Sequence, residues 1–443
     1  MTTSLSDSVT GLPALSGRAW RRRAHRQRGA AALVITLVLF FVMLIAAAYV
    51  NRNLVFEQRS SANQYRATQA FEAAEAGLEW AAAQLNSDQR IGSDCLAAAA
   101  PAVSFRDRFV AHDPATGRFA GRTSAGGSPV ALEAACVRTP AGWSCACPGD
   151  GAPALVAPAG DAVSPAFSVR FLGGDKPGSV RLVSLGCTSL AAPCVRGTAD
   201  AADASATVQV AFALLPALVS APVAALTVRG SVDAGNASIG AHNASGIGIA
   251  IHAGGAIAAP LARLSAAAGG VASEALVDAD AALAALAPER FFAAYFGLDK
   301  LAWKLQPGVR RIACTTNCAG VVGAAIDAYP ANPMLWVTPP AGASARIDGP
   351  VSFGSVANPV AIVVDGPLQI AGAVVVHGVL YARSLRWTDQ ATPGVAAVRG
   401  AVLVEGDYTG DAAADFVYDA QVLSALKQTT GSFVRVNGSW RDY

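Results

Sequence analysis

Hydrophobic residues form one unbroken run near the N-terminus of the chain. Residues 30–50 read AAALVITLVLFFVMLIAAAYV and contain no charged side chain. A helix needs about 20 apolar residues to cross about 30 Å of hydrocarbon, so this run predicts one transmembrane helix. Its anchor positions are Ala30, Val34, Phe40 and Val50.

After this run the apolar positions change to a helical spacing. Phe71, Ala74, Leu78 and Leu85 recur at intervals of three, four and seven residues, with glutamates on the neighbouring surface. Such spacing draws one apolar stripe along a helix. No proline interrupts the chain between residue 30 and Pro101. We therefore expect one helix of about 55 residues, with these four side chains as its packing face.

Period-two patterns begin beyond residue 160 and predict strands. A second uncharged run begins at Val208, but Pro216 and Pro222 interrupt it. It therefore predicts a strand followed by a linker, and the protein crosses the membrane once. Turns rich in Gly, Pro and Asp separate three strand-like pieces, at residues 167–171, 180–185 and 206–212.

Residues 219–443 form a series of short apolar pieces broken by Gly and Asn. They predict stacked short strands in a β-solenoid or a sandwich, and no fixed repeat period emerges. Helical patterns cover residues 274–297 and 418–427, and residues 431–443 predict a strand paired with a neighbour. The strand pieces are residues 226–232, 246–252, 360–366, 373–381 and 401–407.

Composition narrows the class of protein. Of 443 residues, 53% are hydrophobic and 14% are charged. Ordinary soluble domains carry about 25% charged residues, so this composition argues against a disordered chain. Lys and Arg number 33 and Asp and Glu 31, which gives a net charge of +2. Because this small net charge does not attract nucleic acid, we expect no nucleic-acid partner.

Positive charge is concentrated before the apolar run. Six arginines lie between residues 18 and 28, and no acidic residue occurs from residue 8 to residue 56. By the positive-inside rule this asymmetry predicts a cytoplasmic N-terminus and an exported remainder. Two alternatives stay open: a secretory signal cleaved at the small residues 46–48, and a simple uncleaved signal anchor.

All eight cysteines lie in the exported part. An even number in an exported chain predicts disulfides, and short separations favour Cys187 with Cys194 and Cys314 with Cys318. A zinc site is the alternative, although the chain has no Cys-x2-Cys pair and no histidine at ligand spacing from a cysteine. Two more bridges, in an order that stays open, join the other four cysteines: Cys95, Cys136, Cys145 and Cys147.

Three features together carry a family resemblance: Gly29 after Arg28, the uncharged helix, and the sequence AFEAAEAGLE at residues 70–79. Over residues 26–86 the chain resembles the start of PilX-type minor pilins of type IV pili. The resemblance implies that a prepilin peptidase cleaves after Gly29 and methylates Ala30 as the new N-terminus. It also implies that the long helix packs on an antiparallel sheet.

Two positions depart from the common pilin pattern. Most pilins have Phe or Met first and Glu fifth after the cut, whereas this chain has Ala30 and Val34. Val34 has no carboxylate, so it cannot neutralise the N-terminal amine of a neighbouring subunit. An unpaired buried charge of this kind is costly. We therefore expect a low-copy position at the tip or in the initiation complex of a pilus.

The resemblance sets the expected organisation, an α+β pilin-like fold followed by a β-rich distal domain. The expected location is the inner membrane, with the C-terminal region in the periplasm, and then the pilus. The implied partners are the prepilin peptidase, other minor and major pilins, the inner-membrane assembly platform, and a host or environmental surface. The expected domains are a leader (1–29), the helix (30–88), a disulfide-containing pilin-like domain (89–218) and the distal domain (219–443).

No enzyme motif is present: the chain lacks Gly-x-Ser-x-Gly, His-Glu-x-x-His and a P-loop. We expect no catalytic residue, no cofactor and no enzymatic activity. Asp407, Asp411 and Asp415 are the one candidate set for calcium, with a solvated loop as the alternative. Aromatic residues at 291, 292, 295, 296 and 303 predict either a binding patch or, as we prefer, a helix packed on the β-core.

Two other functions remain open. A large tip pseudopilin of a type II secretion system shares the missing glutamate and the size. From a different class, a membrane-anchored carbohydrate-active protein with a β-helix aligns acidic residues along a groove.

Overall fold

The computed structural model describes residues 28–87, 89–125, 130–156, 158, 164–188, 194, 204–237, 239–244, 248–265, 270–329, 332–390 and 392–443. The leader up to residue 27 lies outside the described residues. The chain divides into two compact units, Met1–Gln64 and Tyr65–Tyr443.

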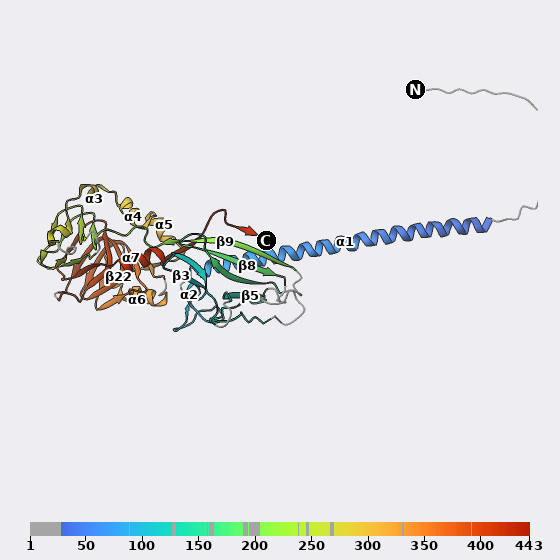
Figure 1. Cartoon of the computed structure of the whole chain (residues 1–443), viewed down its shortest axis with the longest axis horizontal. Coiled ribbons are helices and arrows are strands. Elements are labelled where there is room, and N and C mark those ends of the chain that lie inside the picture. The colour runs from blue at the N-terminus through green and yellow to red at the C-terminus, as the bar shows by residue number, and fades with distance from the viewer. Residues whose placement is uncertain are drawn as a thin grey trace, which may run out of the picture. The chain divides into compact units, whose positions relative to one another are not determined.

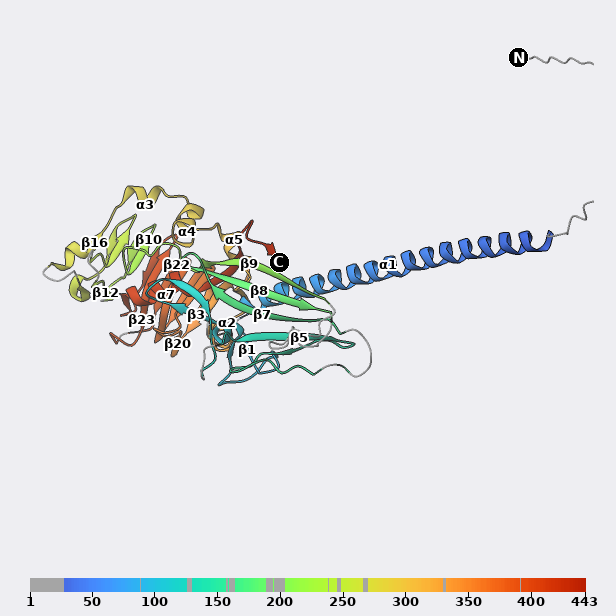
Figure 2. The same cartoon turned by 45° about the vertical axis from the view of Figure 1, so that its right-hand side comes forward.

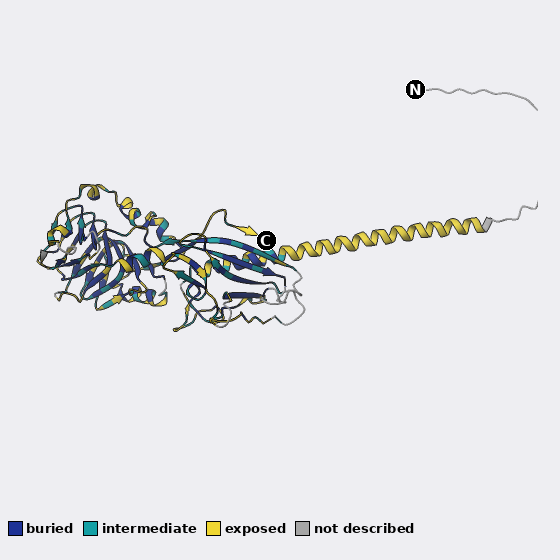
Figure 3. Cartoon of the chain, in the orientation of Figure 1, coloured by how far each residue is buried: buried dark blue, intermediate teal, exposed yellow. Residues whose placement is uncertain are grey.

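Helix α1 (Arg28–Leu85) contains 58 residues and no proline. Residues 30–64 of the first unit are exposed along their whole length (Figure 3). Within the described residues, one helix is long and apolar enough to cross a membrane, judged by its length and composition. The predicted long N-terminal apolar helix is confirmed, followed by a β-rich region (Figure 1).

In the second unit, an antiparallel sheet lies against the C-terminal part of α1. Ala74, Leu78 and Leu85 share one buried cluster with Phe167 and Leu182 of the sheet. The predicted strand pieces at 167–171, 180–185 and 206–212 fall within its three longest strands. Its strand order is β26 (Gly431–Arg435), β9 (Ser205–Pro216), β8 (Ser179–Cys187), β7 (Ala166–Gly173), β5 (Glu133–Thr139), β6 (Gly142–Ala146), and β27 (Arg441–Asp442) also pairs with β9.

Smaller elements pack against this sheet. Ser104 caps the short helix α2, since its side chain accepts a hydrogen bond from the Asp107 amide. The elements are β1 (Arg90–Ile91) paired with β2 (Val103–Ser104), α2 (Phe105–Phe109), and β3 (Val110–Asp113) paired with β4 (Arg118–Gly121).

The final strands of the chain return to the antiparallel sheet. Gly431 pairs with Pro216 and Arg435 with Phe212, so β26 lies antiparallel to β9. Arg441 of β27 pairs with Gln209. Residues 217–430 are therefore inserted between two neighbouring strands of one sheet. The predicted division into domains at residues 89–218 and 219–443 did not include this return of the last strands to the antiparallel sheet.

The inserted residues build a second sheet in which the pairing is parallel throughout. Within the described residues this sheet has sixteen strands, many of them short. The strands are β10 (Leu226–Val228), β11 (Val232–Asp233), β12 (Gly240–His242), β13 (Ile251–Ala253), β14 (Ile257–Ala258), β15 (Leu264–Ser265), β16 (Leu276–Val277), β17 (Val309–Ala313), β18 (Met334–Thr338), β19 (Ala345–Asp348), β20 (Val351–Phe353), β21 (Val360–Ala371), β22 (Val374–Thr388), β23 (Ala397–Val404), β24 (Tyr408–Gly410) and β25 (Asp415–Tyr418).

The parallel strands repeat at a partly regular interval, although no fixed period is evident in the sequence. Leu226 pairs with Ile251 and Ile251 with Leu276, an offset of 25 residues each time. Val309 pairs with Met334 at the same offset. Later offsets differ, since Met334 pairs with Ala361 and Val360 pairs with Gly378. Unequal turns between the later strands hide the period.

The stacking order differs from the chain order. β23 pairs with β10, although about 170 residues separate them in sequence. The chain therefore enters the stack in its middle at β10, proceeds to β13 and β16, and resumes at the other end with β17. It then stacks β18, β21, β22 and β23 until it meets β10 from the opposite side.

Several helices cover one outer face of the parallel strands (Figure 2), whereas Val322 and Ile326 of another helix belong to the inner core. In β21, Ile362 faces the inner core, whereas Ala361 and Val363 face a second core formed with α4, α5 and α7. The predicted helix at 274–297 is broken, and Gly297 ends α4 with a left-handed backbone at φ 73°. The helices are η2 (Leu261–Arg263), η3 (Ala272–Ala275), α3 (Ala281–Ala285), α4 (Pro288–Phe296), α5 (Lys300–Lys304), α6 (Ala319–Ala328) and α7 (Ala420–Gln428).

Candidate functional site

The processing positions lie at the start of α1. Gly29 and Ala30 are in its first turn, and Val34, Phe40 and Val50 follow in the exposed part of the helix. Val34 is 58% exposed and Phe40 is 62% exposed. An apolar helix surface of this length needs lipid or other apolar helices around it, because water solvates it poorly.

The packing face of α1 approaches the antiparallel sheet closely. Ala74, Leu78 and Leu85 are buried, and Phe71 is partly buried against the same cluster. Two glycines allow the approach. A side chain on Gly186 would overlap the Ala70 carbonyl of the helix, and one on Gly77 would overlap Phe167 of the sheet.

Four disulfides join the eight cysteines. Cys187–Cys194 and Cys314–Cys318 are the pairs that the spacing favoured. The sequence left the pairing of the other four cysteines open, and in the structure they form Cys95–Cys147 and Cys136–Cys145. Because every cysteine is in a disulfide, no thiolate is available for the zinc alternative.

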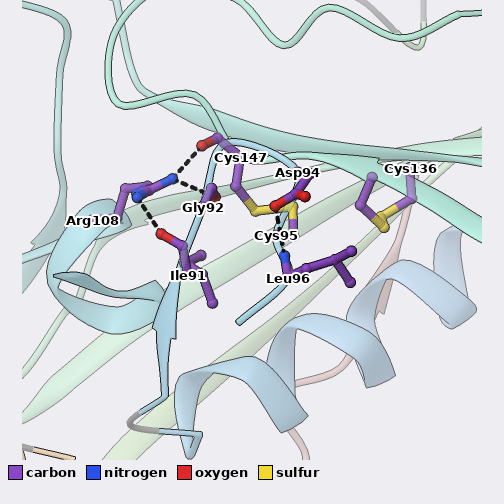
Figure 4. The surroundings of a disulfide bond; sticks show 9 residues. Ile91, Gly92, Asp94, Cys95, Leu96, Arg108, Cys136 and Cys147 are labelled. Carbon is purple, nitrogen blue, oxygen red and sulfur yellow. Dashed lines mark hydrogen bonds between the residues drawn. A yellow bond between two sulfur atoms is a disulfide. The ribbon is translucent and has the colours of Figure 1, made fainter. Parts of the chain in front are cut away.

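Arg108 holds the loops around the Cys95–Cys147 bridge (Figure 4). Its Nη1 donates to the carbonyl oxygens of Gly92 and Cys147 at 2.7 and 2.5 Å, and its Nη2 donates to that of Ile91 at 2.6 Å. Burial lowers the pKa of this guanidinium, which still stays charged at neutral pH. Arg108 therefore stabilises the disulfide-linked segment by charge-assisted hydrogen bonds.

Side chains occupy the outer edge of β26. Asn86, just past α1, accepts a hydrogen bond from the Phe433 amide at 2.7 Å and donates to the Phe433 carbonyl at 2.9 Å. Asn332, from the inserted residues, accepts from the Gly431 amide at 2.6 Å. Arg106 donates to the carbonyl oxygens of Gly431 and Thr429. An otherwise open strand edge is thus satisfied by side chains.

These edge residues were not found from the sequence. Asn86 follows the last residue of a helix, Arg106 lies in a short helix, and neither residue is part of a motif. The guanidinium carbon of Arg106 lies 4.6 Å from the centre of the Phe433 ring. A contact between residues more than 300 positions apart leaves no local pattern.

The candidate calcium aspartates have other partners. Asp415 forms an ion pair with Arg263, and its Oδ1 lies 3.8 Å from Nε2 of His242. Asp407 accepts a hydrogen bond from the Ser231 amide at 2.7 Å. Asp411 follows the short strand β24. In the part of the chain that the structure describes, no group of three His, Cys, Asp or Glu residues is arranged to hold a metal ion.

The aromatic cluster of the inserted residues is core. Phe291, Phe292, Phe296 and Trp303 are fully buried, and Tyr295 packs partly buried against them. The binding-patch interpretation is therefore wrong, because α4 and α5 turn these rings onto the parallel strands.

A charge network around the buried Lys300 fastens α5 to the parallel strands. Lys300 Nζ lies 2.5 Å from Glu405 Oε2 and 3.2 Å from Glu289 Oε1. The Tyr381 hydroxyl donates to the same Glu405 oxygen. Burial, followed by Glu405, raises the pKa of Tyr381 far above its usual value. Glu405 is thereby occupied within the protein.

Comparison with known proteins supports the N-terminal resemblance. Residues 28–79 match the family described as PilX N-terminal, which confirms the PilX resemblance of this segment. No curated protein sequence matches the chain. A crystal structure of the competence-associated pilin ComZ from Thermus thermophilus is similar at 12% identity, covering 85% of this chain and 97% of that chain. Its TM-score of 0.22 does not establish a shared fold.

Proposed function

We propose that the protein is a PilX-like minor component of type IV pilus assembly with a structural, non-enzymatic role. The observation that carries the proposal is the PilX N-terminal match at residues 28–79. This segment contains the apolar run and the start of the helix face that is buried against the sheet. Its exposed apolar surface suits a membrane first and a bundle of pilin helices after assembly.

In this proposal the prepilin peptidase cleaves between Gly29 and Ala30 and methylates Ala30. The helix then serves as anchor at the inner membrane, with the following domains in the periplasm. Phe71, Ala74, Leu78 and Leu85 hold the helix on an antiparallel, pilin-type sheet. Val34, which lacks a carboxylate, favours a tip or initiation position among minor and major pilins on the assembly platform.

The inserted residues 217–430 form, in this proposal, a β-solenoid carried by the pilin-type sheet. Parallel register over many short strands supports the solenoid assignment. Attachment through both β9 and β26 suits a domain that is presented at a tip and contacts a surface or other minor pilins. The function of this domain in attachment is part of the proposal.

The first test is the mature N-terminus, measured by mass spectrometry in membrane and sheared-pilus fractions. We expect N-methyl-Ala30 as the first residue. Gly29→Val should leave the leader attached, whereas the matched variant Gly17→Val should be processed normally. A start at Tyr49 or an uncleaved chain would overturn the proposal. Co-purification with a secretion-system pseudopilus would assign the protein to that filament instead.

The second test replaces residues 217–430 by a short turn. This design keeps β26 and β27, which complete the antiparallel sheet. We expect processing to continue while attachment to surfaces falls. Unchanged attachment and unchanged piliation would refute the tip function of the inserted domain.

A further inference from the structure

A polar pocket lies where the inserted residues meet the antiparallel-sheet domain. Its volume is about 280 Å³. One wall comes from α2, β3 and the end of β4, and the opposite wall comes from residues 357–359 and 429–430. Figure 2 shows α2 and β3 beside α7, and the hydrogen bond from Arg106 to the Thr429 carbonyl joins the two walls.

The charges that line the pocket are mainly positive. Arg106 and Arg122 contribute two guanidinium groups, and Asp107 is the one lining carboxylate among the described residues. Asp107 already accepts a hydrogen bond from the Ser104 hydroxyl at 2.9 Å. The opposite wall contributes Asn358 and other uncharged residues. The pocket therefore attracts negative charge.

Arg122 is oriented but has no acidic partner. Its Nε donates to the Val110 carbonyl at 3.3 Å, which aligns the guanidinium beside β3. No carboxylate in the described parts of the chain forms an ion pair with it. A guanidinium has five N–H donors, so Arg122 keeps donors for a ligand.

His112 adds a buried ring nitrogen that has no partner among the described residues. Its Nε2 atom is buried and has no hydrogen-bond partner within the described residues. Burial lowers the pKa of His112; Asp113 opposes this shift, and Arg106 adds a smaller lowering effect. A buried polar nitrogen without a partner costs free energy, and a bound group that accepts its proton would remove that cost.

We propose that this pocket binds a small oxyanion, a carboxylate or a sulfate, held by Arg122 and His112 against the wall that contains Asn358. The ligand contacts both domains and so stabilises their junction. A free inorganic anion and an acidic sugar share this chemistry. The proposal does not depend on incorporation into a pilus.

The test titrates the full chain, in micelles of an uncharged detergent at constant ionic strength, with sodium sulfate and separately with sodium galacturonate. Imidazole chemical shifts report binding, and His112→Gln identifies the His112 signal. We expect a saturable shift of this signal, a rise in its pKa on binding, and a higher unfolding temperature. Because the protonated ring binds an anion better, binding should be tighter at about pH 5.5 than at about pH 7.5.

Matched arginine variants separate the pocket from general electrostatics. Arg122→Ala should weaken binding about tenfold or more. Arg118→Ala removes the same charge from β4, does not line the pocket, and should change affinity less than about twofold. Circular dichroism checks that each variant is folded, and His112→Gln provides a second pocket variant.

Three results would overturn the proposal: no saturation with either anion, equal losses in the two arginine variants, or unchanged affinity in both Arg122→Ala and His112→Gln. Tighter binding of galacturonate than of sulfate assigns the pocket to acidic sugars. Equal affinity for the two assigns it to the oxyanion alone. Both of these outcomes support the site.

Discussion

Single polar residues hold the last strand of the antiparallel sheet in place. Asn86 forms hydrogen bonds with both the amide and the carbonyl of Phe433, as a further strand would. Asn332 and Arg106 do the same for Gly431. These side chains stand where an added strand would pair, so they protect the edge from other chains.

Replacement of Asn86 by Ala tests this edge. Asn86→Ala leaves the Phe433 amide and carbonyl without these partners, so we expect a loss of about 1–3 kcal/mol in the free energy of unfolding. Denaturant unfolding of the full chain in micelles measures it. Asn53→Ala, at an exposed helix position, is the control and should have little effect. Equal stability of the two variants would show that Asn86 does not stabilise the edge of β26.

The environment of His377 predicts that the stability of the protein depends on pH. Burial, followed by Arg399 on the paired strand, lowers its pKa, and Asp419 opposes the shift. The unfolded chain therefore binds a proton near pH 6.5, while the folded chain resists it to lower pH. Stability should fall as the pH decreases from about 6.5 towards the folded-state value. In His377→Gln the unfolding free energy should fall less over this interval, and an identical pH profile would contradict the argument.

Contacts between α1 and the sheet depend on small residues at the crossing. Gly186 of β8 faces the backbone of α1 at Ala70 and Ala74, and no room remains for a methyl group. Large apolar residues on either side of the crossing then fill the cluster. The packing of the helix is thus limited by backbone approach as well as by its apolar stripe.

A methyl group at this crossing should push the helix from the sheet. We expect Gly186→Ala to lower the free energy of unfolding by about 1–3 kcal/mol, because its contacts are helix backbone atoms that cannot rotate away. Gly173→Ala is the matched control, since nothing lies within 4 Å of the added carbon. Thermal unfolding compares the two variants. A stable Gly186→Ala protein would mean that the helix shifts at little cost.

The whole second unit depends on the return of its C-terminus. β26 and β27 follow the parallel strands in the chain and complete the antiparallel sheet, and Phe433 of β26 is buried in the cluster of α1. A truncation before β26 therefore affects residues far away in sequence. The inserted domain also loses one of its two attachments.

Removal of residues 431–443 should unfold the antiparallel sheet region. Loss of the Phe433 side chain alone is worth about 3–5 kcal/mol, and the edge of β9 becomes open. Limited proteolysis should then cleave between residues 133 and 216. Removal of residues 441–443 is the control and should leave this region protected. Protection in the longer truncation would show that the sheet folds without β26.

Local patterns in the sequence were sufficient for several elements. The apolar run, the stripe of Phe71, Ala74 and Leu78, and the alternating strand at 206–212 depend on neighbours close in sequence. The short cysteine separations also favoured the two pairs that the structure contains. Periodicity and loop length act within a few residues, so one chain reveals them.

Tertiary structure alone decided the rest. It placed β23 against β10, returned β26 to β9, set the order of four cysteines, and gathered Arg122 and His112 in one pocket. Each of these contacts joins segments from different strands or loops. Pairing between distant strands depends on which edges and apolar faces remain to be covered once the other elements have packed, and no local spacing records that choice.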